Sequence, residues 1–187
     1  VEGLDAARKM AILATLGFSM NIELEDVKVS GITNVTQEDL QYAKQLGYTM
    51  KLIGIADLED DKVEVSVQPT LLSDSHPLSL VNDEFNAVYV YGEAVGETMF
   101  YGPGAGSLPT ATSIVSDLVV VMRNMMLGIT GKSVITPQYE KKLKSPEDIR
   151  SKYFLRIQAK DQLGVFAHIT SIFAKHGVSL EKILQLP

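Results

Sequence analysis

Two runs of strand-forming residues, joined by only three acidic residues, constrain the fold of this chain more than any other feature. The runs are TMKLIGIADL (Thr49–Leu58) and KVEVSVQPTLL (Lys62–Leu72). Such a short polar connection predicts an antiparallel hairpin. In the second run Val63, Val65 and Val67 alternate with polar residues. We therefore expect one buried and one solvated face.

Helices are predicted before the hairpin. The stretch Leu4–Leu16 is rich in Ala, Leu and Met, and Gly17 is its predicted end. A second helix begins with Thr36 as N-cap, and Gly47 is its predicted C-cap. Two helices followed by a hairpin indicate a chain in which helices and strands occur in separate stretches.

Three further elements are expected before residue 128. They are a short helical turn in His76–Asp83, two strands in Asn86–Gly102 and a helix over Thr112–Leu127. Apolar residues lie almost all round this helix, which favours a place in a core or a subunit interface. The order of elements predicts an α+β fold, with an open, mixed or mostly antiparallel sheet and helices on one face.

A charged, proline-marked stretch precedes a compact C-terminal unit. We divide the chain into a first domain (1–136), a linker (137–151) and a partial second domain (152–187). In the second domain, alternation over Tyr153–Ala159 predicts a strand, and helical spacing over Val165–Phe173 predicts a helix before a further strand. This strand–helix–strand piece is part of a ferredoxin-like unit. Its sheet edge is unpaired, so we expect it to be poorly packed or completed by another chain.

Composition excludes several classes of function. The net charge of −6 and the pI of about 5.1 argue against nucleic acid or an anionic membrane as the main partner. No apolar run reaches the roughly 20 residues that cross a bilayer. The chain has no cysteine, which excludes a thiolate site and fits a reducing cytoplasm, and its three scattered histidines predict no metal site. Because it begins at Val1 and stops within an expected strand, we expect a fragment of a longer protein.

An acidic and a basic side chain four residues apart form the first candidate site. Asp5 and Lys9 share one face of the first helix. One interpretation is an ordinary surface ion pair, which contributes roughly a few tenths of a kcal/mol. The same face continues through Ile12, Leu13 and Leu16, which favours a face turned toward a core or a cleft wall, where a lysine is held for acid–base chemistry. Spacing leaves both interpretations open.

A glycine-rich loop between a strand and a helix is the second candidate. It reads YGPGAGSLPT (Tyr101–Thr110). Its glycines either permit a tight turn, with Thr110 or Thr112 as N-cap, or let a ligand approach the backbone at a helix N-terminus. Neither a GxGxxG fingerprint nor a P-loop is present. The loop Lys160–Phe166 allows the same two interpretations, a turn or a small-ligand site.

Taken together, these stretches resemble homoserine dehydrogenase. GLDAARK (Gly3–Lys9) looks like the end of that family's signature, in which an Asp precedes a catalytic Lys by four residues. The stretch GITNVTQEDLQYAKQLGYTMKLIGIA (Gly31–Ala56) is similar to the family's mid-domain, and residues His76–Leu118 match its strand, glycine-loop and helix run. The tail resembles an ACT domain, an amino-acid-sensing module, cut after about its first half. The resemblance covers nearly the whole chain.

The resemblance implies an NAD(P)-dependent oxidoreductase that interconverts L-aspartate 4-semialdehyde and L-homoserine in threonine, methionine and isoleucine biosynthesis. Lys9 would be the general acid/base, and Asp5 would bind the substrate. Gly104 and Gly106 would contact the cofactor, NADP or NAD. The family's nucleotide-binding domain is missing from this chain, so we expect the chain alone to be inactive.

The resemblance also implies regulation and assembly. In the ACT-like tail, Asp161, Gly164 and Val165 would bind an amino-acid effector such as threonine. The alternative function is a non-catalytic, amino-acid-binding regulatory module, in which the acidic–basic pair of the first helix is a plain surface pair. Under either function, the apolar helix Thr112–Leu127 favours a homodimer or a higher homo-oligomer.

Overall fold

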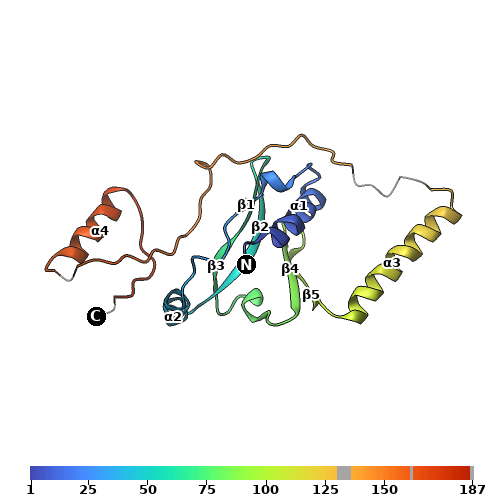
Figure 1. Ribbon diagram of the computed structural model, residues 1–187. Helices are drawn as coiled ribbons and strands as arrows, with labels where there is room; N and C mark the ends of the chain where they lie inside the picture. The colour runs from blue at the N-terminus through green and yellow to red at the C-terminus, as the bar shows by residue number, and fades with distance from the viewer. Residues whose placement is uncertain (130–135, 161, 186–187) are drawn as a thin grey trace.

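The structure is a computed structural model that describes residues 1–129, 136–160 and 162–185. Its helices are α1 (Leu4–Phe18), α2 (Gln37–Gln45), α3 (Ser107–Met126) and α4 (Val165–Lys175), with short 3₁₀ helices η1 (Leu24–Asp26) and η2 (Pro77–Leu80). Its strands are β1 (Lys28–Val29), β2 (Tyr48–Glu59), β3 (Lys62–Ser73), β4 (Phe85–Gly92) and β5 (Gly96–Pro103). In Figure 1, α3 projects on one side of the central sheet, and the C-terminal part with α4 lies on the other.

The central sheet confirms the predicted hairpin. Its strand order is β1-β3-β2, with β2 antiparallel and β1 parallel to β3, so the sheet is open and mixed. The register runs from Tyr48 opposite Ser73 to Glu59 opposite Lys62. Asp60 and Asp61 form the turn, and both have positive φ angles, 51° and 58°. Acidic residues in this conformation are typical of two-residue hairpin turns, because their backbone twist matches that of the strands. The four helices and the open, mixed sheet together confirm the predicted α+β class.

The core lies between α1 and the sheet. Buried alanines of α1 pack against valines of β3, and these residues belong to one cluster: Ala7, Ala11, Ala14, Val63, Val65 and Val67, with Met20, Ile22 and Val27. The small alanine side chains let the helix lie close to the strands. At Gly54 of β2 an added Cβ would collide with the side chain of Met10, so this close approach also requires a glycine in the facing strand.

Two predictions about α1 are wrong. The helix does not end at Gly17 but continues to Phe18, and Ser19 caps it in the left-handed conformation. The face that carries Ile12 and Leu16 does not turn inward, because these side chains are 62% and 47% exposed. The alanine face is the one that fits the valines of β3, and the larger side chains therefore point away from the sheet.

The second face of β3 also differs from expectation. Alternation places Ser66 on the solvated face, yet Ser66 is buried. Ser66 lies in the central strand, between Lys28 of β1 and Ile55 of β2. It also lines a pocket of about 470 Å³ to which Pro146, Ile149, Arg150, Ser151 and Tyr153 contribute. Within the described residues the Ser66 hydroxyl has no hydrogen-bond partner. The valine side of β3 is buried as predicted.

α2 begins at its predicted N-cap, Thr36, but its C-cap is Leu46 and not the predicted Gly47. The hydroxyl of Thr36 accepts from the Asp39 backbone N–H, and the Asp39 carboxylate accepts from the Thr36 N–H, which together form a capping box. These hydrogen bonds hold the pKa of Asp39 below its ordinary value, against the opposing effect of burial. At the other end Gly47 follows the C-cap residue Leu46 with φ +81°, a conformation that favours glycine.

The next elements form a separate two-stranded hairpin. β4 and β5 pair antiparallel around the Gly92–Gly96 turn, and η2 precedes them, as the sequence predicts. The rings of Phe85 and Tyr101 stack with centroids 5.0 Å apart. A two-stranded hairpin is marginally stable by itself in water, so this unit needs support from a further surface.

α3 starts earlier than predicted. Its N-cap is Gly106, not Thr110 or Thr112, and Pro109 lies in the first turn, where its missing N–H costs nothing. The Thr110 hydroxyl donates to the Gly106 carbonyl oxygen from inside the helix. No residue of α3 is buried. Of the two expectations for this helix, a place in the core of this chain is wrong, and an interface stays a prediction.

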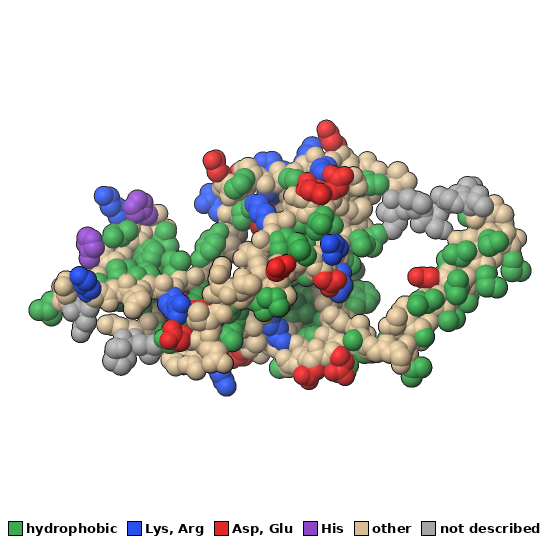
Figure 2. All heavy atoms as spheres, in the orientation of Figure 1, with side chains coloured by type: hydrophobic (Ala, Val, Ile, Leu, Met, Phe, Trp, Pro, Cys, Tyr) green, Lys and Arg blue, Asp and Glu red, His purple; other side chains and the backbone are tan. Residues whose placement is uncertain are grey.

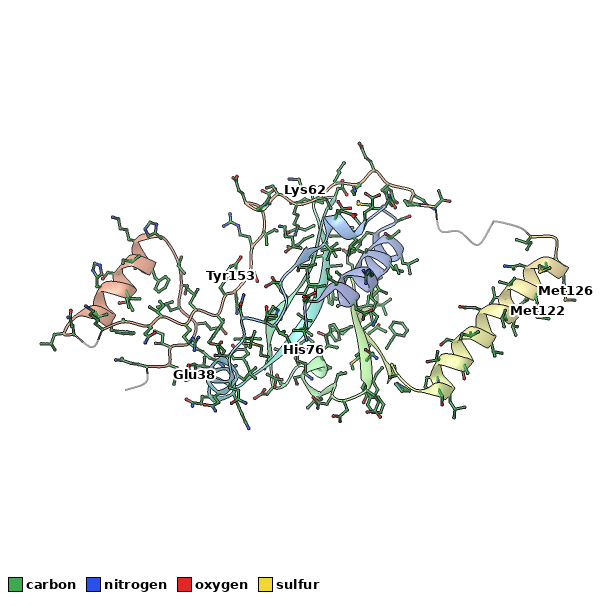
Figure 3. All side chains as sticks on the ribbon, in the orientation of Figure 1. Glu38, Lys62, His76, Met122, Met126 and Tyr153 are labelled. Atoms are coloured by element: carbon green, nitrogen blue, oxygen red, sulfur yellow. The ribbon has the colours of Figure 1, made fainter. Side chains whose placement is uncertain are left out.

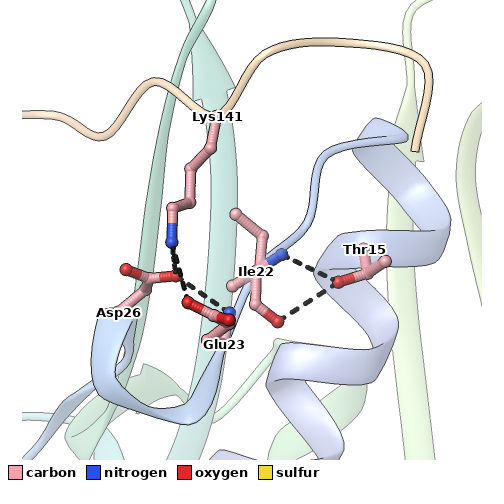
Figure 4. Close-up of polar contacts among 5 residues, drawn as sticks. All are labelled: Thr15, Ile22, Glu23, Asp26 and Lys141. Atoms are coloured by element: carbon pink, nitrogen blue, oxygen red, sulfur yellow. Dashed lines mark hydrogen bonds and ion pairs between the residues drawn. The ribbon is translucent and has the colours of Figure 1, made fainter.

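The first half of the predicted linker (137–151) runs along the first domain. The backbone of Lys142 accepts from the Val63 N–H at 2.8 Å, and the Lys144 N–H donates to the Val63 carbonyl oxygen at 2.9 Å. The Lys141 ammonium contacts the carboxylates of Glu23 and Asp26 at 3.2 and 2.8 Å (Figure 4). The pKa of Lys141 is therefore raised, mainly by its hydrogen bond to Asp26. The domain boundaries at 136 and 151 stay predictions.

The C-terminal unit keeps its helix but not its predicted strands. α4 is present, with His176 as C-cap and Gly177 at φ +69°. Described residues on either side of α4 form no strand. Among the described residues, neither run forms the ladder of backbone hydrogen bonds that defines a strand. Among the described helices, none combines the length and apolar character that crossing a membrane requires.

Candidate functional site

The predicted pair on α1 is present as an ion pair. The Lys9 Nζ lies 2.7 Å from the Asp5 Oδ2, and these side chains are 65% and 81% exposed. The pKa of Asp5 is lowered by the hydrogen bond and the charge of Lys9. The shared face predicted from the spacing is therefore confirmed, and the face is turned to solvent in this chain.

A pocket lies at the N-terminus of α1. Its volume is about 350 Å³, and it is lined by Val1–Ala6, which include Asp5, and by Leu52 of β2. Gly3 is the N-cap of α1 with φ +85°, and an added Cβ would come within 3.1 Å of Val29. This glycine lets the start of the helix lie against the sheet. Asp5 is thereby held in the first turn, where the helix dipole favours a carboxylate.

The surface around the ion pair is apolar. Leu4, Ile12, Leu13 and Leu16 are all exposed on α1. Leu4 directly precedes Asp5, and the other three follow Lys9 at helical spacing. A charged pair surrounded by exposed apolar side chains is typical of a binding surface that a further surface covers. In this chain the pair thus has the surroundings of a site edge, and the pocket at Asp5 supplies space for a small polar molecule.

The glycine loop lies between β5 and α3. Gly104 and Gly106 are exposed. An added Cβ at Gly104 would collide with the Asn86 side chain, and Gly106 has φ +124°, which favours glycine. Both glycines therefore have a structural role in the turn. The residues that line the pocket at Asp5 include none from this loop.

The effector residues predicted in the tail lie at the start of α4. Asp161 falls outside the described residues. Gly164 is the N-cap of α4 with φ +87°, and Val165 is the first residue of the helix. No side-chain hydrogen bond caps this helix, but the N–H of Val165 donates to the Gln162 carbonyl oxygen at 3.3 Å.

The structure also shows charged contacts that sequence spacing did not indicate. Lys144, whose side chain is only 8% exposed, lies 2.8 Å from the carboxylates of Asp57 and Glu59. Its pKa is strongly raised by these two hydrogen bonds. The partners are more than 80 residues apart along the chain, so only the hairpin and the returning segment bring them together. Within the part of the chain that the structure describes, no His, Asp and Glu side chains gather in a group of three or more that suits a metal ion.

Comparison with known families decides the relationship. The sequence model of homoserine dehydrogenase matches residues 1–119, and the model of the ACT domain matches residues 153–187. This chain belongs to the homoserine dehydrogenase family. The resemblance of GLDAARK and of the glycine-loop run to that family is thereby confirmed, as is the ACT-like character of the tail.

Individual members of the homoserine dehydrogenase family are also similar to this chain. Homoserine dehydrogenase of Bacillus subtilis is 72% identical over 187 residues, which are 100% of this chain and 43% of that protein. A crystal structure of a homoserine dehydrogenase from Thiobacillus denitrificans is 35% identical and covers 99% of this chain and 44% of its own, with a TM-score of 0.80. A crystal structure of S. aureus homoserine dehydrogenase at pH 6.5 is 55% identical, covers 65% of this chain and 31% of the S. aureus chain, and has a TM-score of 0.61. This chain therefore spans less than half the length of the relatives it matches.

Proposed function

We propose that this chain is the substrate-binding part of an NAD(P)-dependent homoserine dehydrogenase, which interconverts L-aspartate 4-semialdehyde and L-homoserine in threonine, methionine and isoleucine biosynthesis. One observation supports this most directly. In a chain that matches the family over residues 1–119, Lys9 is held 2.7 Å from Asp5, and Asp5 lines a pocket of about 350 Å³.

The chemistry assigns Lys9 the role of general acid/base. Reduction of the aldehyde adds a hydride to carbon and requires a proton on oxygen, and the nicotinamide supplies the hydride. Lys9 would donate that proton to the carbonyl oxygen and would remove it from the alcohol in the reverse direction. Asp5 orients the Lys9 ammonium and would also accept a hydrogen bond from the ammonium group of the substrate.

The contribution of this chain to cofactor binding would be a backbone contact. Gly106 has no Cβ, is exposed, and stands at the N-terminus of α3, where no side chain caps the helix. Such a site admits a close approach by a polar ligand. Gly104 is constrained by Asn86, so it would act by shaping the loop. The nucleotide-binding domain that the resemblance implies would hold the rest of NADP or NAD.

Turnover of the full-length protein tests this assignment. We expect Lys9→Ala to lower kcat by about 10²- to 10⁴-fold, because a positioned general acid contributes about that much, and to leave cofactor binding unchanged. Arg8→Ala is the matched control, because Arg8 is an exposed cation next to Lys9 on α1. Near-normal turnover of Lys9→Ala would refute the role of Lys9.

The 187-residue chain by itself provides a second test. We expect the pure chain to show no oxidation of NADH or NADPH with aspartate semialdehyde, because hydride transfer needs a cofactor held in place. Measurable oxidation by the isolated chain would show that the cofactor site is more complete than proposed.

We propose that the tail binds an amino-acid effector such as threonine through Asp161, Gly164 and Val165. The match of residues 153–187 to the ACT domain and the N-terminus of α4, where no side-chain hydrogen bond caps the helix, support this. In the full-length protein, titration calorimetry is expected to show saturable threonine binding that Asp161→Asn weakens and Asp5→Asn preserves. Binding that depends on Asp5 alone would instead indicate the substrate site.

We also propose that the full-length protein is a homodimer or a higher homo-oligomer. Apolar side chains follow α3 along most of its length, including Met122 and Met126 (Figures 2 and 3). Light scattering is expected to show an oligomer that Leu118→Asp in α3 weakens. Finding only monomer would count against this proposal. An unchanged oligomer with weakened cofactor binding would show that α3 contacts the nucleotide-binding part of the protein.

A further inference from the structure

The pocket at the N-terminus of α1 is formed by the start of the chain and by one residue of the sheet. Its lining consists of the consecutive residues Val1–Ala6 and of Leu52 in β2. Its volume of about 350 Å³ lies at the small end of the range of roughly 300–1,000 Å³ that is typical of small-molecule sites. Among the residues that the structure describes, Leu52 is therefore the sole contribution of the sheet to this pocket.

Leu52 is held in place by both the sheet and the helix. In β2 it lies opposite Pro69 of β3, and its half-buried side chain packs against the hydrophobic core cluster. The start of α1 lies over this side chain, because a Cβ added at Gly3 would come to 4.0 Å from the Leu52 Cδ2. By contrast, the apolar residues Val1 and Leu4 of the same lining are 81% and 45% exposed. Leu52 is thus the fixed apolar wall of the pocket.

The rest of the lining carries negative charge. Glu2 and Asp5 both line the pocket, and a carboxylate forms strong hydrogen bonds with an ammonium group. The Asp5 Oδ2 also lies 2.7 Å from the Lys9 Nζ, so the acidic edge of the pocket adjoins the proposed general acid. Carboxylates on one segment and an apolar wall on another suit a small molecule that carries a cationic group on a short carbon chain.

The ion pair constrains the shape of a substrate that contacts both of its members. In the proposed function the ammonium group of the substrate contacts Asp5, and its carbonyl or hydroxyl oxygen contacts Lys9. Because these two side chains are direct neighbours, the carbon chain between the ends of the substrate must bend. The pocket that Asp5 lines offers space for this bend, and Leu52 lies on the wall of that space. Each additional methylene would therefore bring the bend closer to Leu52.

We propose that Leu52 is a specificity-determining residue, whose side chain leaves space for the four-carbon chain of the substrate and excludes longer homologues. The proposal rests on the proposed function, in which the pocket at Asp5 binds the substrate. One methylene in an apolar pocket changes kcat/KM by roughly 10–200-fold. Discrimination of this kind requires a wall whose position is locked by packing, which a core-packed residue of a strand provides.

The experiment uses the full-length protein and compares kcat/KM for the oxidation of two alcohols, L-homoserine and 5-hydroxy-L-norvaline, its homologue with one more methylene. We expect the parent to prefer L-homoserine by at least about tenfold. Leu52→Ala removes most of the apolar wall and is expected to reduce this preference at least about fivefold, mainly by raising kcat/KM for the longer alcohol. Leu52→Phe narrows the pocket and is expected to lower kcat/KM for both alcohols, and for the longer one more strongly.

Leu24→Ala is the matched control for the loss of a core leucine. Leu24 is also half-buried and packs against the same cluster, but it does not line the pocket at Asp5. Both leucine-to-alanine changes lower stability, so the ratio of the two kcat/KM values is the readout, and Leu24→Ala is expected to keep the ratio of the parent. If Leu52→Ala does not fold, the milder Leu52→Val is expected to change the ratio in the same direction and by less.

The outcomes separate this inference from the proposed function. A parent that oxidises both alcohols equally well would overturn the role of Leu52, and so would Leu52 variants that keep the ratio of the parent. An equal change of the ratio in Leu24→Ala would overturn it too, because the effect would then come from the core as a whole. In each of these cases the proposed function stays intact. A parent that oxidises neither alcohol would overturn both.

Discussion

α1 and α3 are both long helices rich in apolar residues, but only α1 buries them. α1 places Ala7, Ala11 and Ala14 against the valines of β3, whereas no residue of α3 is buried. The difference comes from what lies opposite each helix. α1 packs on a long hairpin, and α3 leads away from the two-stranded β4–β5 sheet (Figure 1). Apolar content therefore shows that a helix needs a covering surface, but not where that surface lies.

The largest expected effect tests directly whether the core against which α1 packs and α3 differ in burial. Val67→Asp places an unpaired carboxylate in the fully buried centre of the core, and we expect loss of cooperative folding of the 187-residue chain. Val120→Asp makes the same change on α3, where Val120 is exposed, and in the monomeric 187-residue chain is expected to change the free energy of unfolding by less than about 0.5 kcal/mol. Urea unfolding followed by circular dichroism measures both. Equal losses would show that α3 is buried in solution.

The next effect concerns the close approach of α1 to the sheet. Ala11→Leu is expected to lower the free energy of unfolding by about 1–3 kcal/mol, because the extra side chain has no space against β3. Ile12→Ala, at the neighbouring exposed position, is the control and is expected to change it little. Chemical denaturation is the measurement. A neutral Ala11→Leu would mean that the alanine face is not packed as described.

A smaller effect tests whether residues 139–144 belong to the compact region. Lys144→Met is expected to lower the free energy of unfolding by about 1 kcal/mol, since it removes two ion pairs whose carboxylates are exposed. The neighbouring Lys142→Met is the control. The pKa of Lys144 is strongly raised in the folded state, so its contribution is complete below its unfolded pKa of about 10.4, declines above that value and is lost only as the pH rises through the folded pKa. Denaturation at pH 7 and pH 11 compares the two variants, and a loss of equal size at both pH values would contradict the ion-pair explanation.

The smallest effect sharpens the contrast between the two faces of β3. Ser66 is buried without a hydrogen-bond partner in the described part of the chain. Ser66→Ala removes this unpaired hydroxyl and is expected to leave the free energy of unfolding within about 0.5 kcal/mol or to raise it slightly. Thermal unfolding is a suitable measurement. A loss greater than about 1 kcal/mol would indicate that the hydroxyl is paired in solution.

Local sequence signals predicted the elements that depend on neighbouring residues. The capping box of Thr36 and Asp39, the hairpin of β2 and β3, and the alternation of buried valines are all present. The same kind of signal failed at Gly17 and at Thr112. A glycine ends a helix only when the backbone there turns to positive φ, and at α1 the turn is made by Ser19.

The candidate site likewise combines features that the sequence predicted with features that it did not. Spacing alone placed Asp5 and Lys9 on one face, and the ion pair follows from that spacing. Spacing did not decide which face of α1 meets the sheet, and the apolar residues near the pair suggested the wrong one. The contacts of Lys144 with Glu59 and of Arg156 with Glu38 join residues more than 80 positions apart, for which no local pattern exists.

The sequence by itself thus determined the helices, the hairpin, the Asp5–Lys9 spacing and membership of the family, because these depend on side chains close together in the chain. Only the tertiary structure decided which faces are buried, where residues 139–144 run and which end of α2 meets Arg156 or Lys182. The physical reason is that burial and ion pairing depend on complementary surfaces from distant segments. Those surfaces exist only once the chain has folded.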